Sequence, residues 1–166
     1  MKQGQKGLTL IESMMVIALI GILATIAIPP AFQLYEDSQA REQVTEAINL
    51  LDSVKSPVAT FYSDKGRWPT AEEFNGLVPT RTGKYVASLT PQSLKKGFEV
   101  IARFKNTGVS PSLVAEGSGR TLVLATTNGT EWFCNDKTGS PNAIPDLVPG
   151  TVLPQHRPSL CKQETP

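Results

Sequence analysis

Few residues in this 166-residue chain could perform chemistry. The only histidine is His156, and the only cysteines are Cys134 and Cys161. One histidine and two thiols cannot supply a multi-histidine or a four-thiolate zinc site. A cysteine–histidine nucleophile pair would require both partners to lack their ordinary roles. Because the sequence also shows no convergent nucleophile and base, we expect a protein that is not an enzyme and that has no cofactor and no metal ion.

Smaller motifs each have a simpler structural interpretation. Asn128-Gly129-Thr130 fits a glycosylation sequon, but a hairpin turn explains Asn-Gly. Glu116–Arg120 resembles a phosphate loop but lacks the Gly-Lys-Ser/Thr that would follow, so we interpret it as a flexible link. Asp136 and Asp146 could contribute to a calcium site, but no compact run of oxygen ligands surrounds them. His156 lies among prolines without a second imidazole, which predicts a surface histidine.

The charge of the chain is nearly balanced. It has 16 Lys plus Arg against 15 Asp plus Glu, a formal net charge of +1, and 40% apolar residues. This charge provides no basic field for nucleic acid, so no specific nucleic-acid partner is expected. The apolar content is too high for a disordered chain.

One carboxylate, Glu12, borders a long apolar stretch. No charged residue occurs from Ser13 through Tyr35, and these 23 residues would reach roughly 34 Å as a helix, against a hydrocarbon thickness of about 30 Å. The stretch therefore predicts a membrane span. A secretory signal peptide would have a shorter apolar core and a cleavage site after it, and the length also disfavours a buried soluble helix.

Glu12 has two interpretations in this setting. At bilayer depth its carboxylate costs on the order of 2 to 3 kcal/mol. It could simply favour the positive end of the helix dipole, which contributes a few tenths to about 1 kcal/mol. Alternatively it pairs with a cation, for which Lys6 and any new α-amino group are the candidates.

The orientation of the span bears on the two cysteines. Lys2 and Lys6 precede the span and no acid occurs before Glu12, so the positive-inside rule keeps the N-terminus cytoplasmic and exports the rest. An oxidising compartment would then pair Cys134 with Cys161, and two buried free thiols are the alternative. The disulfide would contribute roughly 3 to 4 kcal/mol in the chain-entropy model.

The N-terminal motif resembles that of a known family. The run Lys6-Gly7-Leu8-Thr9-Leu10-Ile11-Glu12 is similar to the processing motif of short-leader, type IVa-like type IV prepilins. The likeness continues through Met14–Ile17, Gly21, the Ile-Ala-Ile before Pro29, the phrase Tyr62–Pro69 and the cysteine-bounded C-terminal region. The chain departs from it at Leu8, where the short-leader class most often has Phe.

The resemblance implies cleavage between Gly7 and Leu8 by a prepilin peptidase, which would also methylate the Leu8 amine. It implies that Glu12 pairs with the Leu8 amine of a neighbouring subunit in a helical homo-oligomeric filament. The implied partners are the peptidase/methyltransferase and the inner-membrane pilus assembly machinery. The implied location is the inner membrane as a single-pass protein, followed by the extracellular filament.

The chain after the span predicts further elements. Apolar residues recur at steps of three and four from Ala40 to Phe61, which predicts an amphipathic helix that Pro29 kinks but does not end. We expect a loop over 64–97 with a short helix near Thr70–Phe74. Strands are expected over 98–105 and 121–127, with Asn128-Gly129 forming a two-residue type I′ hairpin to residues 130–134. Prolines exclude central strands from residues 135–166.

These patterns combine into an α+β fold. We expect a long N-terminal helical spine, part membrane span and part amphipathic, packed against a small antiparallel sheet with a disulfide-bounded C-terminal region. The expected segments are a cleaved leader (1–7), a transmembrane and filament-core helix (8–35) and a globular domain (36–166). The expected function is a structural pilus subunit, and a minor pilin or a secretion-system pseudopilin is the alternative.

Overall fold

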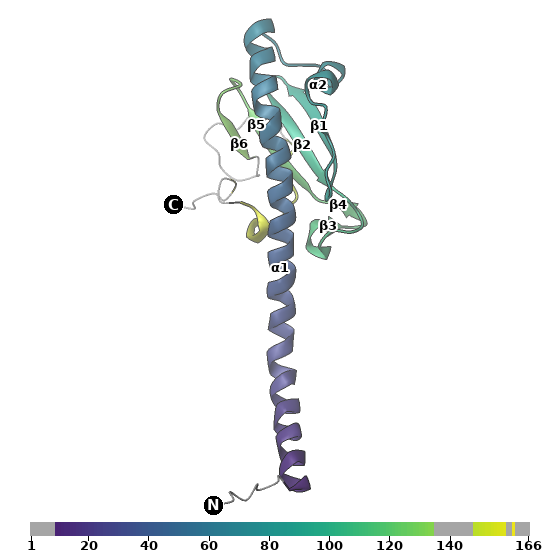
Figure 1. Cartoon of the computed structure of the whole chain (residues 1–166). Helices are drawn as coiled ribbons and strands as arrows, with labels where there is room; N and C mark the ends of the chain where they lie inside the picture. The colour runs from purple at the N-terminus through teal and green to yellow at the C-terminus, as the bar shows by residue number, and fades with distance from the viewer. Residues whose placement is uncertain (1–8, 135–147, 159–160, 162–166) are drawn as a thin grey trace, which may run out of the picture. The chain divides into compact units, whose positions relative to one another are not determined.

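The computed structural model describes residues 9–134, 148–158 and 161, and the side chains of 26–33 lie outside this description. The chain divides into two compact units, Met1–Tyr35 and Glu36–Pro166. Helix α1 (Leu10–Lys65) contributes residues to both (Figure 1). It ends at Lys65, later than the predicted Phe61, and Gly66 follows it. That glycine has a φ of +66° and donates its N–H to the carbonyl of Tyr62 at 2.9 Å, a common helix terminator.

The first unit exposes those of its apolar side chains that the structure describes. Every large apolar residue from Leu10 to Leu23 is exposed, from 48% for Val16 to 78% for Leu10. In the part of the chain described, no helix combines the length and the apolarity needed to cross a membrane. The predicted span, residues 8–35, also includes residue 8 and the side chains of 26–33, which are outside the described residues.

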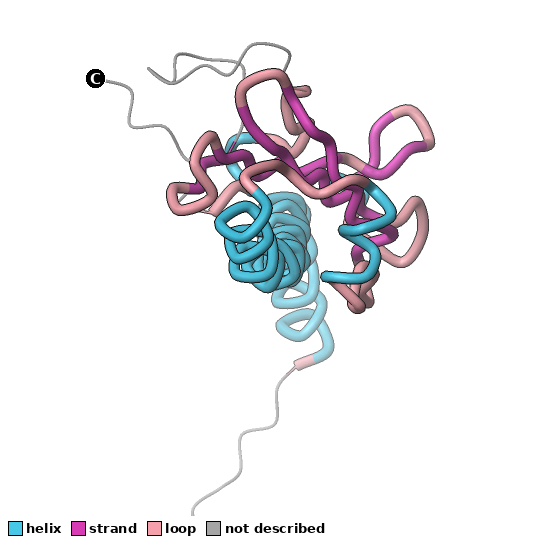
Figure 2. Tube along the Cα trace, turned by 90° about the horizontal axis from the view of Figure 1, so that it is seen from above, coloured by secondary structure: helices cyan, strands magenta, loops and turns pink. Residues whose placement is uncertain are grey.

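The second unit is an α+β layer, as predicted. Four antiparallel strands form one sheet in the order β1 (Val86–Leu94), β2 (Gly97–Phe104), β5 (Thr121–Thr126) and β6 (Trp132–Cys134). Viewed end-on, these strands lie along one side of α1 (Figure 2). Smaller elements complete the unit: α2 (Ala71–Leu77), η1 (Pro111–Leu113), β3 (Val114–Ala115), β4 (Ser118–Gly119) and η2 (Pro154–His156).

The core lies between α1 and the sheet. Most of the predicted helical stripe is buried, with Ala40, Val44, Ala47, Leu51, Val54 and Val58 each at most 1% exposed, while Phe61 is half-buried. The helix-facing side of β2 carries Phe98, Val100, Ala102 and Phe104, all fully buried. The apolar face of α1, with its 3.6-residue period, therefore packs against the apolar face of β2, with its two-residue period, in one hydrophobic layer.

Strand β1 corrects the prediction of a loop over residues 64–97. It pairs antiparallel with β2 along its length, and Pro91 lies opposite Val100. Pro91 is compatible with a strand because β1 is at the edge of the sheet, where the missing N–H removes no internal ladder bond.

The predicted two-residue turn at Asn128-Gly129 is also wrong. The last pair of the β5–β6 hairpin is Thr126 with Trp132, so residues 127–131 form a wider loop. A type I′ turn needs a positive φ at both central residues, and of these two Gly129 has one (+79°) while Asn128 does not. Instead the Asn128 side-chain oxygen accepts the N–H groups of Thr130 at 3.0 Å and Glu131 at 2.9 Å.

The two-residue hairpin lies where we predicted a flexible link. Ala115 pairs with Ser118, and between them Glu116 and Gly117 have φ values of +50° and +75°. These values are those of a type I′ turn, so Glu116-Gly117 joins β3 to β4.

Candidate functional site: the N-terminal motif and the elements that carry it

The described part of the N-terminal motif begins at Thr9. The backbone N–H of Glu12 donates to the Thr9 carbonyl at 3.1 Å and lies 3.4 Å from the Thr9 hydroxyl, so Thr9 caps the helix that starts at Leu10. Sequence reasoning missed this role, although the spacing Thr-x-x-Glu is a capping-box pattern. Gly7 and Leu8 lie outside the described residues.

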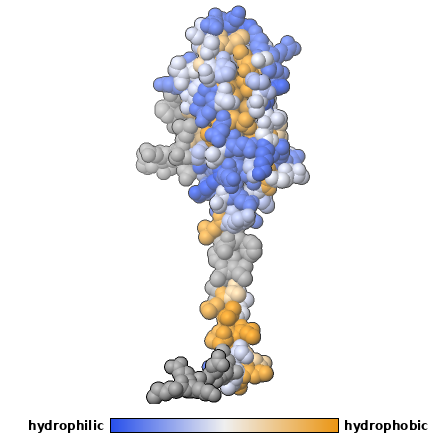
Figure 3. Space-filling model, viewed as in Figure 1, coloured by the Kyte–Doolittle hydropathy of each residue, from blue (hydrophilic) through white to orange (hydrophobic). Residues whose placement is uncertain are grey.

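Glu12 lies in the first turn of α1, on an exposed and otherwise apolar surface. Its neighbours Leu10 and Ile11 are 78% and 70% exposed, and the described side chains of this segment form the apolar surface seen in Figure 3. Among the described residues, no cation forms an ion pair with its carboxylate. The position suits a carboxylate near the positive end of a helix, and it leaves the group available to an external cation.

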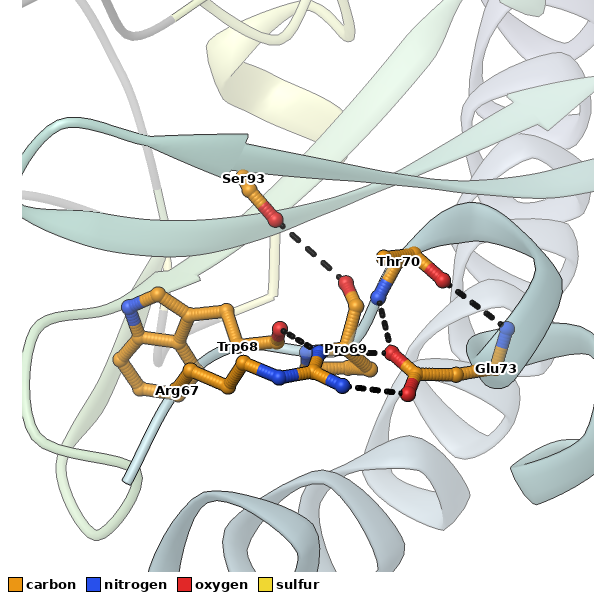
Figure 4. Close-up of polar contacts among 6 residues, drawn as sticks. All are labelled: Arg67, Trp68, Pro69, Thr70, Glu73 and Ser93. Carbon is orange, nitrogen blue, oxygen red and sulfur yellow. Dashed lines mark hydrogen bonds and ion pairs between the residues drawn. The ribbon is translucent and has the colours of Figure 1, made fainter. Parts of the chain in front are cut away.

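The connection from α1 to the sheet is fixed by a polar cluster at the start of α2 (Figure 4). The guanidinium of Arg67 donates to both carboxylate oxygens of Glu73, at 2.8 and 2.6 Å. The same carboxylate accepts the N–H of Thr70 at 2.9 Å, while the Thr70 hydroxyl accepts the N–H of Glu73 at 3.3 Å. This reciprocal pair is a capping box that starts α2 at Ala71, close to the predicted Thr70–Phe74.

The charges of this cluster reinforce each other. The Arg67 guanidinium hydrogen-bonds the Glu73 carboxyl and, with the N–H of Thr70, lowers the pKa of Glu73 to about 2. The same hydrogen bond raises the pKa of Arg67. Both side chains are partly exposed to solvent, so the pair positions the loop more than it stabilises the fold.

Aromatic rings hold the same connection against the core. Trp68 stacks on Tyr62 of α1 with ring centroids 3.9 Å apart and lies 5.5 Å from the ring of Phe98 in β2. The Ser93 hydroxyl of β1 donates to the carbonyl of Pro69 at 3.4 Å (Figure 4). The segment Tyr62–Pro69, which carries part of the sequence resemblance, thus joins helix, loop and sheet.

The structure pairs Cys134 with Cys161, as predicted, with their Cα atoms 5.1 Å apart. Cys134 is the last residue of β6, and Cys161 is 5% exposed and belongs to the core. The bond ties the described residues 148–158 to the sheet by closing the chain on both sides of them.

The prediction of a surface histidine is wrong. His156 is 1% exposed, and its Nε2 lies 3.6 Å from the Asp37 carboxylate. The reason is that η2 turns this residue inward while Pro154 and Arg157 remain accessible. Burial lowers the pKa of His156; Asp37 opposes that shift, and Arg41 and Arg120 add to it.

Three further carboxylates are Glu99, which is buried, and Asp136 and Asp146, which the sequence suggested as calcium ligands. Glu99, which the alternation of β2 places on the face away from α1, is fully buried, and burial raises the pKa of its carboxyl while the N–H of Val148 opposes the shift. Asp136 and Asp146 lie outside the described residues. Within the described ranges, no three His, Cys, Asp or Glu residues are arranged to hold a metal ion.

Comparisons with known proteins agree with this architecture. Residues 40–162 match the pilin family of bacterial filaments, and residues 2–28 match the prokaryotic N-terminal methylation motif. The chain is 42% identical over 138 residues to fimbrial protein EcpC of Eikenella corrodens, covering 81% of this chain and 85% of that protein. It is 35% identical over 165 residues to the type IV major pilin protein PilE1 of Neisseria gonorrhoeae, covering 95% and 94%. It is also 35% identical over 170 residues to a fimbrial protein of Neisseria meningitidis serogroup B, covering 95% and 94%.

These matches cover both units of the chain. The chain therefore belongs to the pilin family. It is a type IV prepilin and a structural subunit of a pilus.

Proposed function

We propose that the precursor is cut between Gly7 and Leu8 by a prepilin peptidase that then methylates the Leu8 amine, with residues 1–7 as the leader. The match to the N-terminal methylation motif supports this proposal. The helix start supports it as well: α1 begins at Leu10 with Thr9 as its cap, so the bond to be cut precedes the helix. Within a helix, backbone hydrogen bonds would withhold the peptide bond from the active site of a peptidase.

Residues 8–35 serve, in this proposal, first as a single inner-membrane span and then as the filament-core helix, and residues 36–166 form the globular domain. The exposed apolar side chains from Leu10 to Leu23 support this role, because such a surface requires lipid or protein to cover it. The boundary between the two compact units, after Tyr35, supports the division into segments. Lys2 and Lys6 favour retention of the N-terminus in the cytoplasm and export of the rest to the extracellular filament.

Glu12 is the assembly residue in this proposal. Its carboxylate, in the first turn of an apolar helix and without a described cation beside it, pairs with the Leu8 amine of a neighbouring subunit. A pair of opposite charges in an apolar filament core would fix the axial register of an incoming subunit, since a shifted subunit leaves both charges unpaired. The pilus assembly machinery of the inner membrane would deliver each subunit to this position.

The N-terminus of assembled filaments tests the proposal. Filaments sheared from cells and analysed by mass spectrometry should yield a first peptide that begins with N-methylated Leu8. Filaments whose subunits retain residues 1–7 would contradict it.

Immunogold labelling then separates the two uses of such a subunit. Label along the whole filament indicates a major pilin, the role named for the gonococcal relative. Label confined to tips, or absent from surface filaments, indicates a minor pilin or a pseudopilin.

A further inference from the structure

The buried imidazole of His156 is unusual among the polar groups of this molecule. Its side chain is closed to solvent, and neither ring nitrogen has a hydrogen-bond partner among the described residues. The Asp37 carboxylate of α1 lies 3.6 Å from Nε2 and is 46% exposed. A buried polar group without a hydrogen bond is costly, and adding a proton to it raises that cost further.

Contacts that do not depend on pH attach the start of the segment 149–157 to Arg120 and Thr121 rather than to α1. Thr151 donates its N–H to the Thr121 carbonyl at 2.8 Å, and its hydroxyl accepts the Thr121 N–H at 2.8 Å. Arg120 donates to the Thr151 carbonyl at 2.9 Å, and Val152 is buried in the core. His156 brings this segment to α1, because its Nε2 lies 3.6 Å from the Asp37 carboxylate.

We propose that His156 is an acid-sensitive clip, which holds residues 149–157 against the Asp37–Arg41 turn of α1 and releases them locally when its imidazole gains a proton. The disulfide between Cys134 and Cys161 keeps the released segment attached to the sheet, so the change is an opening of one surface rather than unfolding.

The charges that face the imidazole determine the direction of the effect. Asp37 on α1 favours the protonated form, while Arg41 on α1 and Arg120 before β5 disfavour it, and Arg157 adjoins it in the sequence. Burial dominates, so the pKa of His156 is lower in the closed segment than in the open one. Above pH 6.5, the ordinary pKa of histidine, the imidazole is neutral in both forms and the closed form is fully favoured. As the pH falls below 6.5, the open form gains a proton first, and the closed form loses stability until the pH passes its own, lower pKa.

Hydrogen exchange of the mature full chain in detergent micelles tests the clip between pH 8 and pH 5. The exchange rate of peptides from residues 149–157 is divided by the rate of an unstructured peptide of the same sequence at the same pH. This ratio removes the intrinsic pH dependence of exchange. The opening constant should rise as the pH falls, by up to about tenfold per pH unit between the two pKa values. Peptides from β2 should not change. A rise shared by all peptides, or none at residues 149–157, would overturn the proposal.

Two variants and a titration separate the clip from a purely structural role. His156→Gln cannot titrate and should remove the pH dependence of opening. Asp37→Asn removes the opposing charge and should make opening more sensitive to acid. Because His156 is the only histidine, its ring proton can be assigned by NMR in the unmodified protein. A pKa below 6.5 supports the clip, and a value at or above 6.5 would overturn it even if His156→Gln fails to fold.

Discussion

Glu12 is a residue whose position in the first turn permits two quite different roles. As a helix-dipole partner its carboxylate would contribute less than about 1 kcal/mol, and its loss would matter little. As one half of a pair between subunits it would be far more important, because losing it leaves the other charge buried and unpaired at a cost of roughly 3 to 5 kcal/mol. The Thr9 hydroxyl supplies an acceptor for the Glu12 N–H. The start of the helix therefore does not require the Glu12 side chain, and the two roles predict different effects of its removal.

Glu12→Ala should therefore separate processing from assembly. The variant should insert and be cleaved, because removing a charge makes the apolar helix easier to bury. Its surface filaments should be lost, and Glu12→Gln should be intermediate, since an amide accepts a hydrogen bond but carries no charge. The measurement is sheared filament yield beside the mature membrane pool, with the variant as the only copy of the subunit. Normal filament yield from Glu12→Ala would reject the pairing.

Position 119 accepts only glycine for a steric reason. A Cβ added there would lie within van der Waals overlap of the Phe104 carbonyl, a backbone atom that cannot rotate away. We expect Gly119→Ala to destabilise the second unit by about 1 to 3 kcal/mol, as overpacking of a tight site does.

Gly76→Ala is the matched control, because no atom lies within 4 Å of the added Cβ and Gly76 is within helix α2. It should be neutral or stabilising by up to about 1 kcal/mol. Denaturant unfolding followed by the fluorescence of Trp68 and Trp132 measures both variants. Equal stabilities for the two would show that the backbone at Gly119 relaxes freely.

At the scale of elements, α2 depends on its capping box. Thr70→Ala removes the acceptor for the Glu73 N–H and should lower the free energy of unfolding by about 1 kcal/mol. Thr60→Ala is the control, since Thr60 is an exposed residue of α1, where alanine has the higher helix propensity. If both substitutions have the same effect on the denaturant midpoint, Thr70 does not act as a cap.

The ion pair beside this cap predicts a pH dependence. The pKa of Glu73 is about 2 against an ordinary 4.5, so its contribution is complete above 4.5 and is lost as the pH falls toward 2. Glu73→Gln should flatten the loss of stability over this window while leaving stability above it only slightly reduced, because the pair is partly exposed. Thermal unfolding at several pH values measures this, and parallel curves for the two proteins would contradict it.

Elements with a clear hydrophobic period were predictable from the sequence, and those set by tertiary contacts were not. The stripe from Ala40 to Val58 and the alternation of β2 both follow directly from residue spacing. Strand β1 contains Pro91, and only its place at the sheet edge makes that residue tolerable. Asn128-Gly129 is the better type I′ dipeptide, yet Glu116-Gly117 makes the tight turn, because the pairing of the flanking strands decides where the turn falls.

The candidate site divides in the same way. The pairing of Cys134 with Cys161 could be predicted from the expected export of the chain, whereas the assembly role of Glu12 stays a prediction. The burial of His156 could not be predicted, because it depends on how η2 packs against α1, which no local pattern records.

At the scale of the whole molecule, the disulfide joins the end of the sheet to the C-terminal region. It encloses the described residues 148–158, whose Val152 and His156 are both buried in the second unit. Those residues form no regular strand, and their hydrogen bonds to the rest of the second unit gather at Thr151 and Val152, which bond to Thr121 and Arg120. The covalent bond therefore limits how far this region can separate in both the folded and the unfolded chain.

Removing the disulfide should weaken the second unit as a whole. Cys134→Ser or Cys161→Ser should each lower the free energy of unfolding by roughly 2 to 5 kcal/mol, because the unfolded chain regains the entropy of an open loop. The double variant should lose no more than about the same amount, since either substitution breaks the same bond. Denaturant unfolding gives these values, and limited proteolysis should show faster cleavage within residues 149–158 than within α2. Free-thiol labelling of both cysteines in the native exported protein, or additive losses in the double variant, would show that the two residues act separately.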